Sequence, residues 1–210
     1  MSVEFTVLYN GVTYADFSQA MSDAVTDLQN SFNSAAPKVN IELKRFFNKI
    51  ADEMSRRHGT PWKAGTTRNS LSLRSGGGVR SIRNSIKLMS GKSYNRTGGS
   101  ISTGKMTIHE TGGTITPKRS QYLTIPTDFA LDSRGVPIKQ SARQWENTFV
   151  RTSKAGNLLI FQKRGKDIVP LYVLKKSVRL RPRLGMAKTF EDNIPFFEQR
   201  VLNVIDKELG

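Results

Sequence analysis

Cysteine is absent from the sequence, and long apolar runs are missing as well. The lack of cysteine excludes disulfide bonds, thiolate metal sites and cysteine nucleophiles together. The longest apolar runs, such as Leu158–Phe161, have only a few residues, so we expect no segment that crosses a bilayer. The N-terminus has neither the basic stretch nor the apolar core of a signal peptide. We therefore expect a protein that is stable in a reducing cytoplasm without cross-links.

Acidic residues are scarce, and one long stretch has none. The 210 residues include 33 Lys and Arg against 17 Asp and Glu, which gives a formal net charge of +16 and a pI near 10.4. No Asp or Glu lies between Ser55 and His109, where eleven cations occur. A second basic stretch follows at 175–183, while the acids gather toward the two ends. This excess favours association with a polyanion such as nucleic acid, and its placement predicts one basic face.

Aromatic residues are nearly missing from the acid-free stretch, where Trp62 and Tyr94 are the only rings. Stacking on single-stranded bases is therefore poorly supported. Contact with duplex phosphate, or lining of a channel through which DNA passes, fits the pattern better. No sequence-reading module is visible, so any such contact is expected to be independent of base sequence. The candidate cations are Arg68, Arg74, Arg80, Arg83, Lys87, Lys92 and Arg96.

The N-terminal third shows strand and helix patterns. Residues 3–9 alternate between apolar and polar and then meet Asn10-Gly11, which predicts a strand and a turn. A helix is predicted to follow an N-cap at Thr13 and to be broken at Ala35-Ala36-Pro37. A second helix is predicted over 38–57, ending near Gly59. These patterns divide the chain into an N-terminal extension (1–36) and a single domain (37–210).

The rest of the chain reads as loops, short strands and a last helix. Flexible basic loops rich in Gly and Arg are expected over 59–104, interrupted at Val79–Met89 by a short amphipathic helix or by a helix that leads into a strand. A helical repeat over 190–209 predicts the C-terminal helix, with Pro195 in its first turn or kinking it. Strands and a hairpin at 163–167 are expected between them, which indicates an α+β fold with helices on one face of a mainly antiparallel sheet. The expected strands are 106–108, 113–117, 122–126, 158–162 and 171–174.

Candidate catalytic patterns are weak. Gly91-Lys92-Ser93 lacks the earlier glycine that a phosphate-binding loop requires. His109-Glu110 has no neighbouring metal ligands, and we expect it to end a strand and enter a turn. Nothing around Asp128 and Asp132 indicates a metal site, so neither an enzyme nor a cofactor is predicted. Glu110 is the only acid between Glu53 and Asp128, and we expect it to pair with an arginine, within the chain or across an interface.

Several short motifs occur in a characteristic order. Ile108–Pro117 reads IHETGGTITP, and Tyr122–Pro126 reads YLTIP. Elements at 74–86, 170–178 and 181–185 agree with the same pattern. Together they resemble the virion-morphogenesis or tail-completion family of tailed bacteriophages over roughly residues 40–208. The sequence departs from that pattern at Arg183, where an aromatic residue is common, and this puts an aromatic anchor there in doubt.

The resemblance implies a structural virion protein that acts in tail completion or head–tail joining, without catalysis. It implies a ring, expected to be sixfold, that caps the tail tube after assembly in the host cytoplasm. The expected partners are further copies of the chain, a tail terminator or tail tube protein, adaptor or neck proteins, and genomic DNA in the lumen, with no membrane. The expected interface residues are His109, Glu110, Gly112, Gly113 and Pro117 in the motif turn, and Arg181, Pro182 and Arg183 in the link to the last helix.

Two other function classes remain open at this point. A free, sequence-independent DNA- or RNA-binding protein would use the basic region as its footprint and lose affinity steeply with salt. A hydrolase would need paired carboxylates or a histidine-rich centre, which the sequence does not offer. The resemblance does not cover the first thirty or so residues, which we interpret as an addition that embraces a neighbouring subunit.

Overall fold

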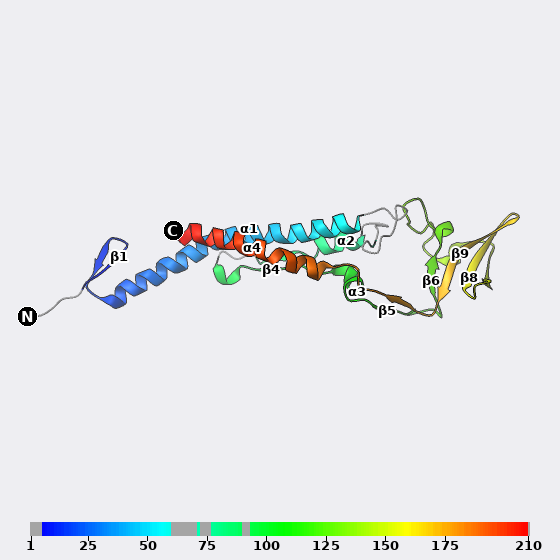
Figure 1. The fold of residues 1–210 in the computed structure, drawn as a ribbon, viewed down its shortest axis with the longest axis horizontal. Helices are drawn as coiled ribbons and strands as arrows, with labels where there is room; N and C mark the ends of the chain where they lie inside the picture. Colours follow the sequence, from blue (N-terminus) through cyan, green and yellow to red (C-terminus); the bar gives the residue numbers. More distant parts are fainter. Residues whose placement is uncertain (1–5, 60–70, 72–76, 90–92, 210) are drawn as a thin grey trace, which may run out of the picture. The chain divides into compact units, whose positions relative to one another are not determined.

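The computed structural model describes residues 6–59, 71, 77–89 and 93–209 (Figure 1). Of these described residues, 49% are helical and 23% are in strands, and every strand pair among them is antiparallel. The expected α+β fold, with a long helix in the N-terminal part and a C-terminal helix, is therefore confirmed. Contacts group the chain into two compact units. The first unit comprises Met1–Lys49, Ile86–Ile101 and Phe190–Gly210, and the second comprises Ile50–Ser85 and Ser102–Thr189.

The first unit begins with a two-stranded hairpin. Strand β1 (Val7–Tyr9) pairs antiparallel with β2 (Val12–Tyr14) across the predicted turn. Asn10 and Gly11 both have positive φ, at 46° and 78°. Two such residues form the turn that matches the twist of a tight hairpin, which explains why this pair of residues stands there.

Helix α1 runs without interruption from Phe17 to His58, and it corrects two predictions. Its N-cap is Asp16 rather than Thr13, because the Asp16 carboxylate accepts hydrogen bonds from the N–H and the hydroxyl of Ser18. The break expected at Pro37 is wrong, so the expected division after residue 36 falls inside the helix. Proline removes one backbone hydrogen bond but keeps a helical φ, and Ala35 and Ala36 beside it are buried. The helix ends at His58, as the sequence predicts.

Helix α4 (Met186–Leu209) packs antiparallel on α1 within the first unit (Figure 1). The ring of Phe46 lies 4.9 Å from that of Phe190 and 4.8 Å from that of Phe197, measured between centroids. Closer to the C-terminus, Lys38 forms an ion pair with Glu208. A small hairpin of β3 (Lys87–Leu88) and β4 (Gly99–Ser100), with the turn η2 (Tyr94–Arg96) between them, completes the unit.

The second unit holds the C-terminal end of α1 and short helices. Helix α2 (Gly77–Arg83) begins two residues before the segment 79–89, where a short helix or a helix leading into a strand was predicted, and it overlaps the first part of that segment. The strand predicted at 106–108 is wrong, because the turn η3 (Gly104–Met106) and helix α3 (Thr107–Thr111) occupy that segment. Strands β5 (Gly113–Ile115) and β10 (Val178–Leu180) form a separate antiparallel pair.

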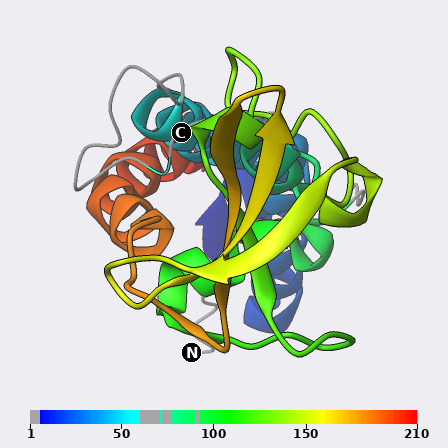
Figure 2. The ribbon, with the colours of Figure 1, turned by 90° about the vertical axis from the view of Figure 1, so that its right-hand side faces the viewer.

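A four-stranded antiparallel sheet forms the rest of the second unit (Figure 2). Its order is β6-β9-β8-β7, and its strands are β6 (Leu123–Pro126), β7 (Thr148–Thr152), β8 (Leu158–Arg164) and β9 (Asp167–Lys175). The hairpin predicted around Gly165 is the β8–β9 turn. Turns η4 (Asp128–Ala130) and η5 (Ala142–Gln144) contribute Ala130 and Ala142 to the packing around Leu171 and Tyr172.

Candidate functional site

The predicted interface residues of the motif turn and of the C-terminal link lie together in the second unit. The carbonyl of His109 accepts hydrogen bonds from the N–H groups of Arg183 and Leu184, at 2.7 and 2.8 Å. Strand β5 pairs with β10 so that Gly113 stands opposite Leu180. The structure therefore joins segments that are about seventy residues apart in the sequence.

Gly112 is the point of closest approach in this junction. Its φ is 71°, and a Cβ placed on it would lie 2.8 Å from Cδ of Pro182. Only glycine takes up that conformation without strain and leaves room for the proline ring. Two other predicted residues lie next to these strands: Pro117 follows β5, and Arg181 follows β10 with an exposed side chain.

Glu110 caps the last helix. Its carboxylate accepts hydrogen bonds from the N–H of Met186 (2.9 Å) and from the N–H of Ala187 (3.0 Å), the first two residues of α4. The sequence led us to expect an ion pair with arginine, within the chain or across an interface. Among the described residues the contacts of Glu110 are with this helix terminus instead, and a pair across an interface stays a prediction. The N-terminus of a helix carries unpaired N–H groups and a partial positive charge, so it attracts a carboxylate as a cation does.

His58 is buried at the end of α1, and both of its ring nitrogens have partners. Nδ1 accepts a hydrogen bond from the N–H of Leu71 (3.2 Å), so the ring proton of neutral His58 is on Nε2, which donates to the carbonyl of Leu184 (2.9 Å). Burial lowers the pKa of His58, because the charged ring would lose hydration. Burial also lowers the pKa of His109, and the charge of Arg183 adds to that effect.

Arg57 ties the same junction together. Its guanidinium donates to the carbonyl of Gly185 (3.1 Å) and to the hydroxyl of Thr189 (2.8 Å). These contacts, with those of His58 and Glu110, hold the start of α4 against the end of α1. The motif residues that the sequence singled out thus anchor a helix, which is a structural role.

The candidate DNA-contacting cations are dispersed. Arg68, Arg74 and Lys92 lie outside the described residues, as do residues 60–70, 72–76 and 90–92 of the segment predicted to form flexible loops. Arg80 and Arg83 stand on α2 in the second unit, and Arg83 forms an ion pair with Asp52. In the first unit, Lys87 lies on β3 and Arg96 lies in η2.

A further group of cations lies in the segment that carries the four-stranded sheet, and only its last part, at 175–183, was noted from the sequence. Residues 118–180 contain thirteen Lys and Arg against four Asp and Glu. Most of these cations stand in turns or at the ends of strands, one to three at a time. Counting charge for each expected element, instead of searching for acid-free stretches, would have found them. The cations are Lys118, Arg119, Arg134, Lys139, Arg143, Arg151, Lys154, Lys163, Arg164, Lys166, Lys175, Lys176 and Arg179.

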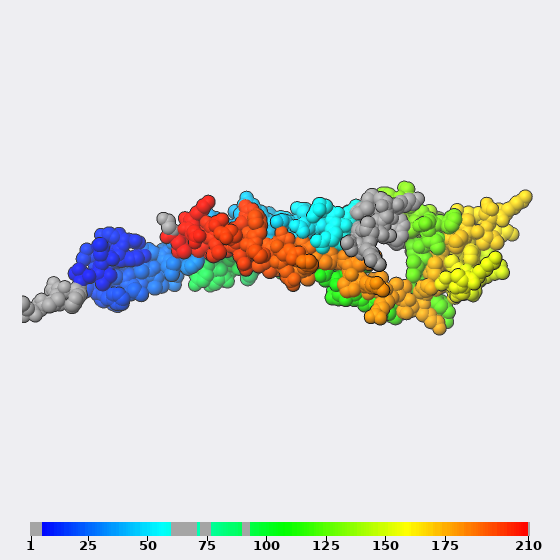
Figure 3. Space-filling view, viewed as in Figure 1, coloured from blue at the N-terminus to red at the C-terminus, as the bar shows by residue number. Residues whose placement is uncertain are grey.

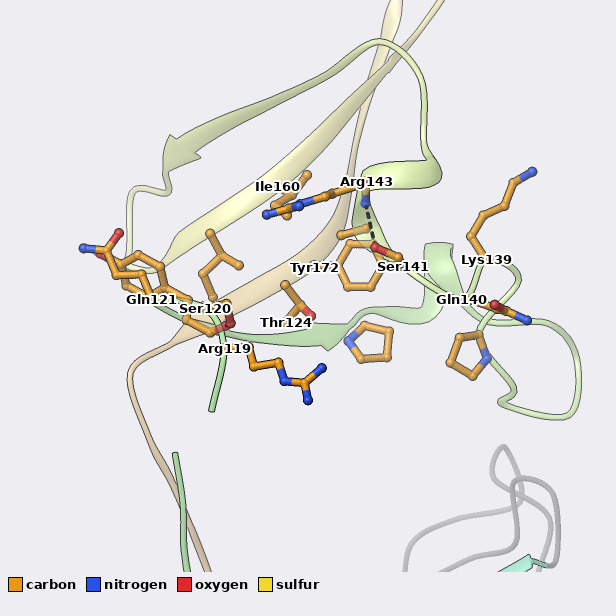
Figure 4. Close-up of a pocket in the computed structure, with 15 residues that line it drawn as sticks. Arg119, Ser120, Gln121, Thr124, Lys139, Gln140, Ser141, Arg143, Ile160 and Tyr172 are labelled. Carbon is orange, nitrogen blue, oxygen red and sulfur yellow. Dashed lines mark hydrogen bonds between the residues drawn. The ribbon is translucent and has the colours of Figure 1, made fainter. Parts of the chain in front are cut away.

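A pocket of about 570 Å³ opens on one face of this sheet (Figure 4). Among the described residues, its lining includes three cations, Arg119, Lys139 and Arg143, and no Asp or Glu. Figure 4 shows Arg119 and Arg143 on opposite sides of Thr124 and Tyr172 in this view. We call this site the basic sheet pocket.

The basic sheet pocket has an apolar floor and basic walls. Strand register places Pro126, Tyr172, Ile160 and Val150 opposite one another along the four strands, so their side chains share the floor face. The walls are the segments 119–122 and 137–143, which carry the three cations. The arrangement suits a guest that is apolar on one side and acidic on the other.

A second surface of interest is the apolar face of α1. Phe17, Met21, Val25 and Leu28 project within a sector of about 80° at 100° per residue. Their exposed fractions lie between 47% and 65%. The same face continues to Ala35 and Phe46, which are buried, so it is covered in one part of the helix and bare in the other. Figure 3 shows the N-terminal part of α1 in blue, beside the hairpin.

The hairpin does not cover this apolar face, because it packs on the opposite side of the helix. The hydroxyl of Tyr14 donates to Asp23 (2.8 Å), and that of Tyr9 donates to Asp27 (3.2 Å). The bond to the Asp23 carboxylate raises the pKa of Tyr14. We call Val7–Leu28 the N-terminal arm. Its helix is apolar on one side and acidic on the other, and residues 1–37 contain four acids and no Lys or Arg.

An apolar groove of about 760 Å³ lies between α1 and α4 in the first unit. Val39 and Leu43 line it from α1, and Ile194, Val201 and Leu202 line it from α4. Glu198 is the only charged residue in its lining. The groove is thus a second surface on which an apolar helix face could pack.

Within the described part of the chain, no group of three or more His, Asp or Glu side chains is placed to hold a metal ion. None of the helices described is both long and apolar enough to cross a membrane. Comparison of this chain with protein-family models, with curated proteins and with solved structures finds no match.

Proposed function

We propose that this chain is a structural ring subunit of a tailed bacteriophage, which completes the tail and joins it to the head, and that it has no enzymatic activity. Its partners are further copies of itself in a sixfold ring, the tail terminator or tail tube protein, and adaptor or neck proteins. It caps the tail tube in the virion after assembly in the host cytoplasm. Genomic DNA passes through its lumen without sequence-specific contact.

The bare apolar face of α1 carries this proposal. Four large side chains that repeat at helical spacing are about half exposed, and the hairpin beside them packs elsewhere. Covering their remaining apolar area would contribute roughly 1 kcal/mol for each side chain, at about 25 cal/mol per Å². A contiguous exposed patch of this kind marks a contact surface with another protein. This supports an assembly subunit over a free monomer.

The motif resemblance supports the choice of assembly. Two of the segments that carry the resemblance, the motif turn and the C-terminal link, form one hydrogen-bonded junction at the start of α4. A motif that maintains a helix anchor fits a shared structural role. The thirteen cations of residues 118–180 supply the positive charge that weak, screened contact with passing DNA needs.

The thirteen cations of residues 118–180 also favour one alternative function, that of a sequence-independent DNA- or RNA-binding protein. Its affinity for duplex DNA would be high at low salt and would fall steeply as salt rises. A ring subunit would instead self-associate and hold DNA weakly at physiological salt, because tight grip would stall delivery.

Mass photometry with negative-stain microscopy of the purified chain separates the two, together with a duplex-DNA gel shift at 50 and 200 mM salt. Closed rings and no shift at the higher salt are the expected results. A monomer at every concentration that still shifts DNA at the higher salt would replace the ring by the nucleic-acid-binding function.

A further inference from the structure

We propose that the N-terminal arm of one copy of this chain docks in the basic sheet pocket of a second copy. The inference rests on the proposed ring assembly and names the two surfaces that would form its interface. It also gives the first thirty residues, which the motifs leave out, a defined task.

Charge complementarity selects the two surfaces. The arm lies in the stretch 1–37, which has four acids and no Lys or Arg, so that stretch is the most acidic part of the chain. The sheet segment 118–180 carries thirteen cations against four acids, and the pocket on it has a lining with cations and no acid. Opposite potentials steer two such surfaces together and fix their orientation.

The distribution of apolar groups on the two surfaces also matches. The arm presents Phe17, Met21, Val25 and Leu28 on one side of α1, and its carboxylates point to the other side. The pocket presents apolar groups on its floor and cations on its walls. A helix that lies with its apolar side on the floor turns its acidic side away from the floor, and the wall cations on its two flanks then attract its carboxylates.

The apolar groove between α1 and α4 is a weaker receptor for the arm. It matches the apolar side, but residues 190–209 of α4 carry five acids against Arg200 and Lys207. Glu198 stands in the groove itself, and the hydrophobic contact would be opposed by repulsion from the acidic arm. The basic sheet pocket matches the arm both in charge and in its apolar surface, whereas the groove matches only the apolar surface.

Arm and pocket are different surfaces of the same chain, so their contact is head-to-tail. A head-to-tail interface propagates from copy to copy and closes into a ring when the rotation permits. A head-to-tail contact also predicts that a copy with a defective arm still has a functional pocket, and that a copy with a defective pocket still has a functional arm.

The arm is tested by two substitutions that add the same charge. Val25→Asp places a carboxylate on the apolar side, and Asn30→Asp places one near the acidic side, three residues after Asp27. Both positions are exposed, so we expect both variants to keep the wild-type circular dichroism. We expect Val25→Asp to weaken self-association at least about tenfold, because it would bury an unpaired carboxylate, and Asn30→Asp to leave it within about threefold. If Val25→Asp fails to fold, Met21→Asp is the second variant.

The pocket is tested in the same way. Arg119→Glu with Arg143→Glu reverses two wall cations, and Lys154→Glu with Lys166→Glu makes the same charge change in exposed turns outside the pocket lining. Sedimentation velocity should show at least about a tenfold loss of association for the first pair and a much smaller loss for the second. Equal losses would mean that only net charge matters, and would overturn the docking.

Mixing the two defective chains gives the sharpest result. Val25→Asp chains keep their pocket and the Arg119→Glu, Arg143→Glu chains keep their arm, so the mixture should form a one-to-one heterodimer that neither forms alone. Absence of the heterodimer overturns the docking. A further variant, Leu202→Asp, changes the groove between α1 and α4. If Leu202→Asp loses self-association while the Arg119→Glu, Arg143→Glu chain keeps it, the arm binds in the groove and the docking is also overturned. Tail capping by wild-type protein is measured separately, and its failure would remove the proposed function whatever the arm does.

Discussion

The contact that anchors α4 offers the most quantitative prediction. Replacing Glu110 by Gln keeps the shape of the side chain but removes its charge, and its amide can accept from only one of the two N–H groups of Met186 and Ala187. A hydrogen bond to a charged group contributes roughly 1.5–3 kcal/mol, and the favourable charge at a helix N-terminus contributes about 0.3–1 kcal/mol more. We expect a loss of about 2 kcal/mol for Glu110→Gln and about 3 kcal/mol for Glu110→Ala.

Urea denaturation followed by far-ultraviolet circular dichroism measures this loss, because α4 is a large part of the helical signal. For a chain of this length, 2 kcal/mol corresponds to a fall in Tm of roughly 4–8 °C. Glu146→Gln removes an exposed carboxylate from the same unit and is the matched control, with an expected change within about 0.5 kcal/mol. A change that small for Glu110→Gln would refute the capping role.

Three further predictions concern the same junction and one distant turn. Because the pKa of buried His58 is lowered, the unfolded chain binds the proton more readily than the folded one, so the free energy of unfolding should fall as pH drops below the ordinary value of 6.5. Urea midpoints between pH 7.5 and 5 measure this slope, and an equal slope in His58→Gln would assign it elsewhere. Gly112→Ala should destabilise by about 2–3 kcal/mol, because it adds a clash to an unfavourable φ, whereas Gly156→Ala, with φ of 75° and open space around it, should cost about 1 kcal/mol. The same titrations check both, and equal losses would contradict the close approach at Gly112. Arg57→Ala should cost about 1–3 kcal/mol through its bonds to the start of α4, and an unchanged midpoint would contradict that.

Local signals predicted where α1 ends, but not where it begins or that it is continuous. The basic last turn and Gly59 placed the end of α1 correctly, because both act within one turn of the chain. Pro37 is also a local signal, and it predicted a break that the helix does not have. The apolar face keeps its phase on both sides of the proline, and packing along that face outweighs the loss of a single hydrogen bond.

Strand β7 shows a different limit. All five of its residues are exposed, so it has none of the alternation by which a half-buried strand is recognised. It exists because β8 offers it an edge for backbone pairing. At 106–108 the sequence predicted a strand that the structure does not have. Three residues are too few to distinguish a strand from the turn and short helix found there.

The candidate site could be located from the sequence only in part. The motif residues do come together, but the partner of Glu110 is a helix terminus 76 residues away, and no local pattern names it. The basic sheet pocket collects Arg119, Lys139 and Arg143 from two loops through the pairing of β6 with β9. Such a constellation depends on strand register, which spacing in one sequence does not supply.

Electron microscopy of isolated phage tails mixed with gold-labelled chain tests the proposed function most directly. Bound label should appear at one end of each tail, the head-proximal end, as a ring that is coaxial with the tube. An excess of unlabelled chain should compete it away. Label that is absent from tails, or that is scattered along their length, would contradict the account.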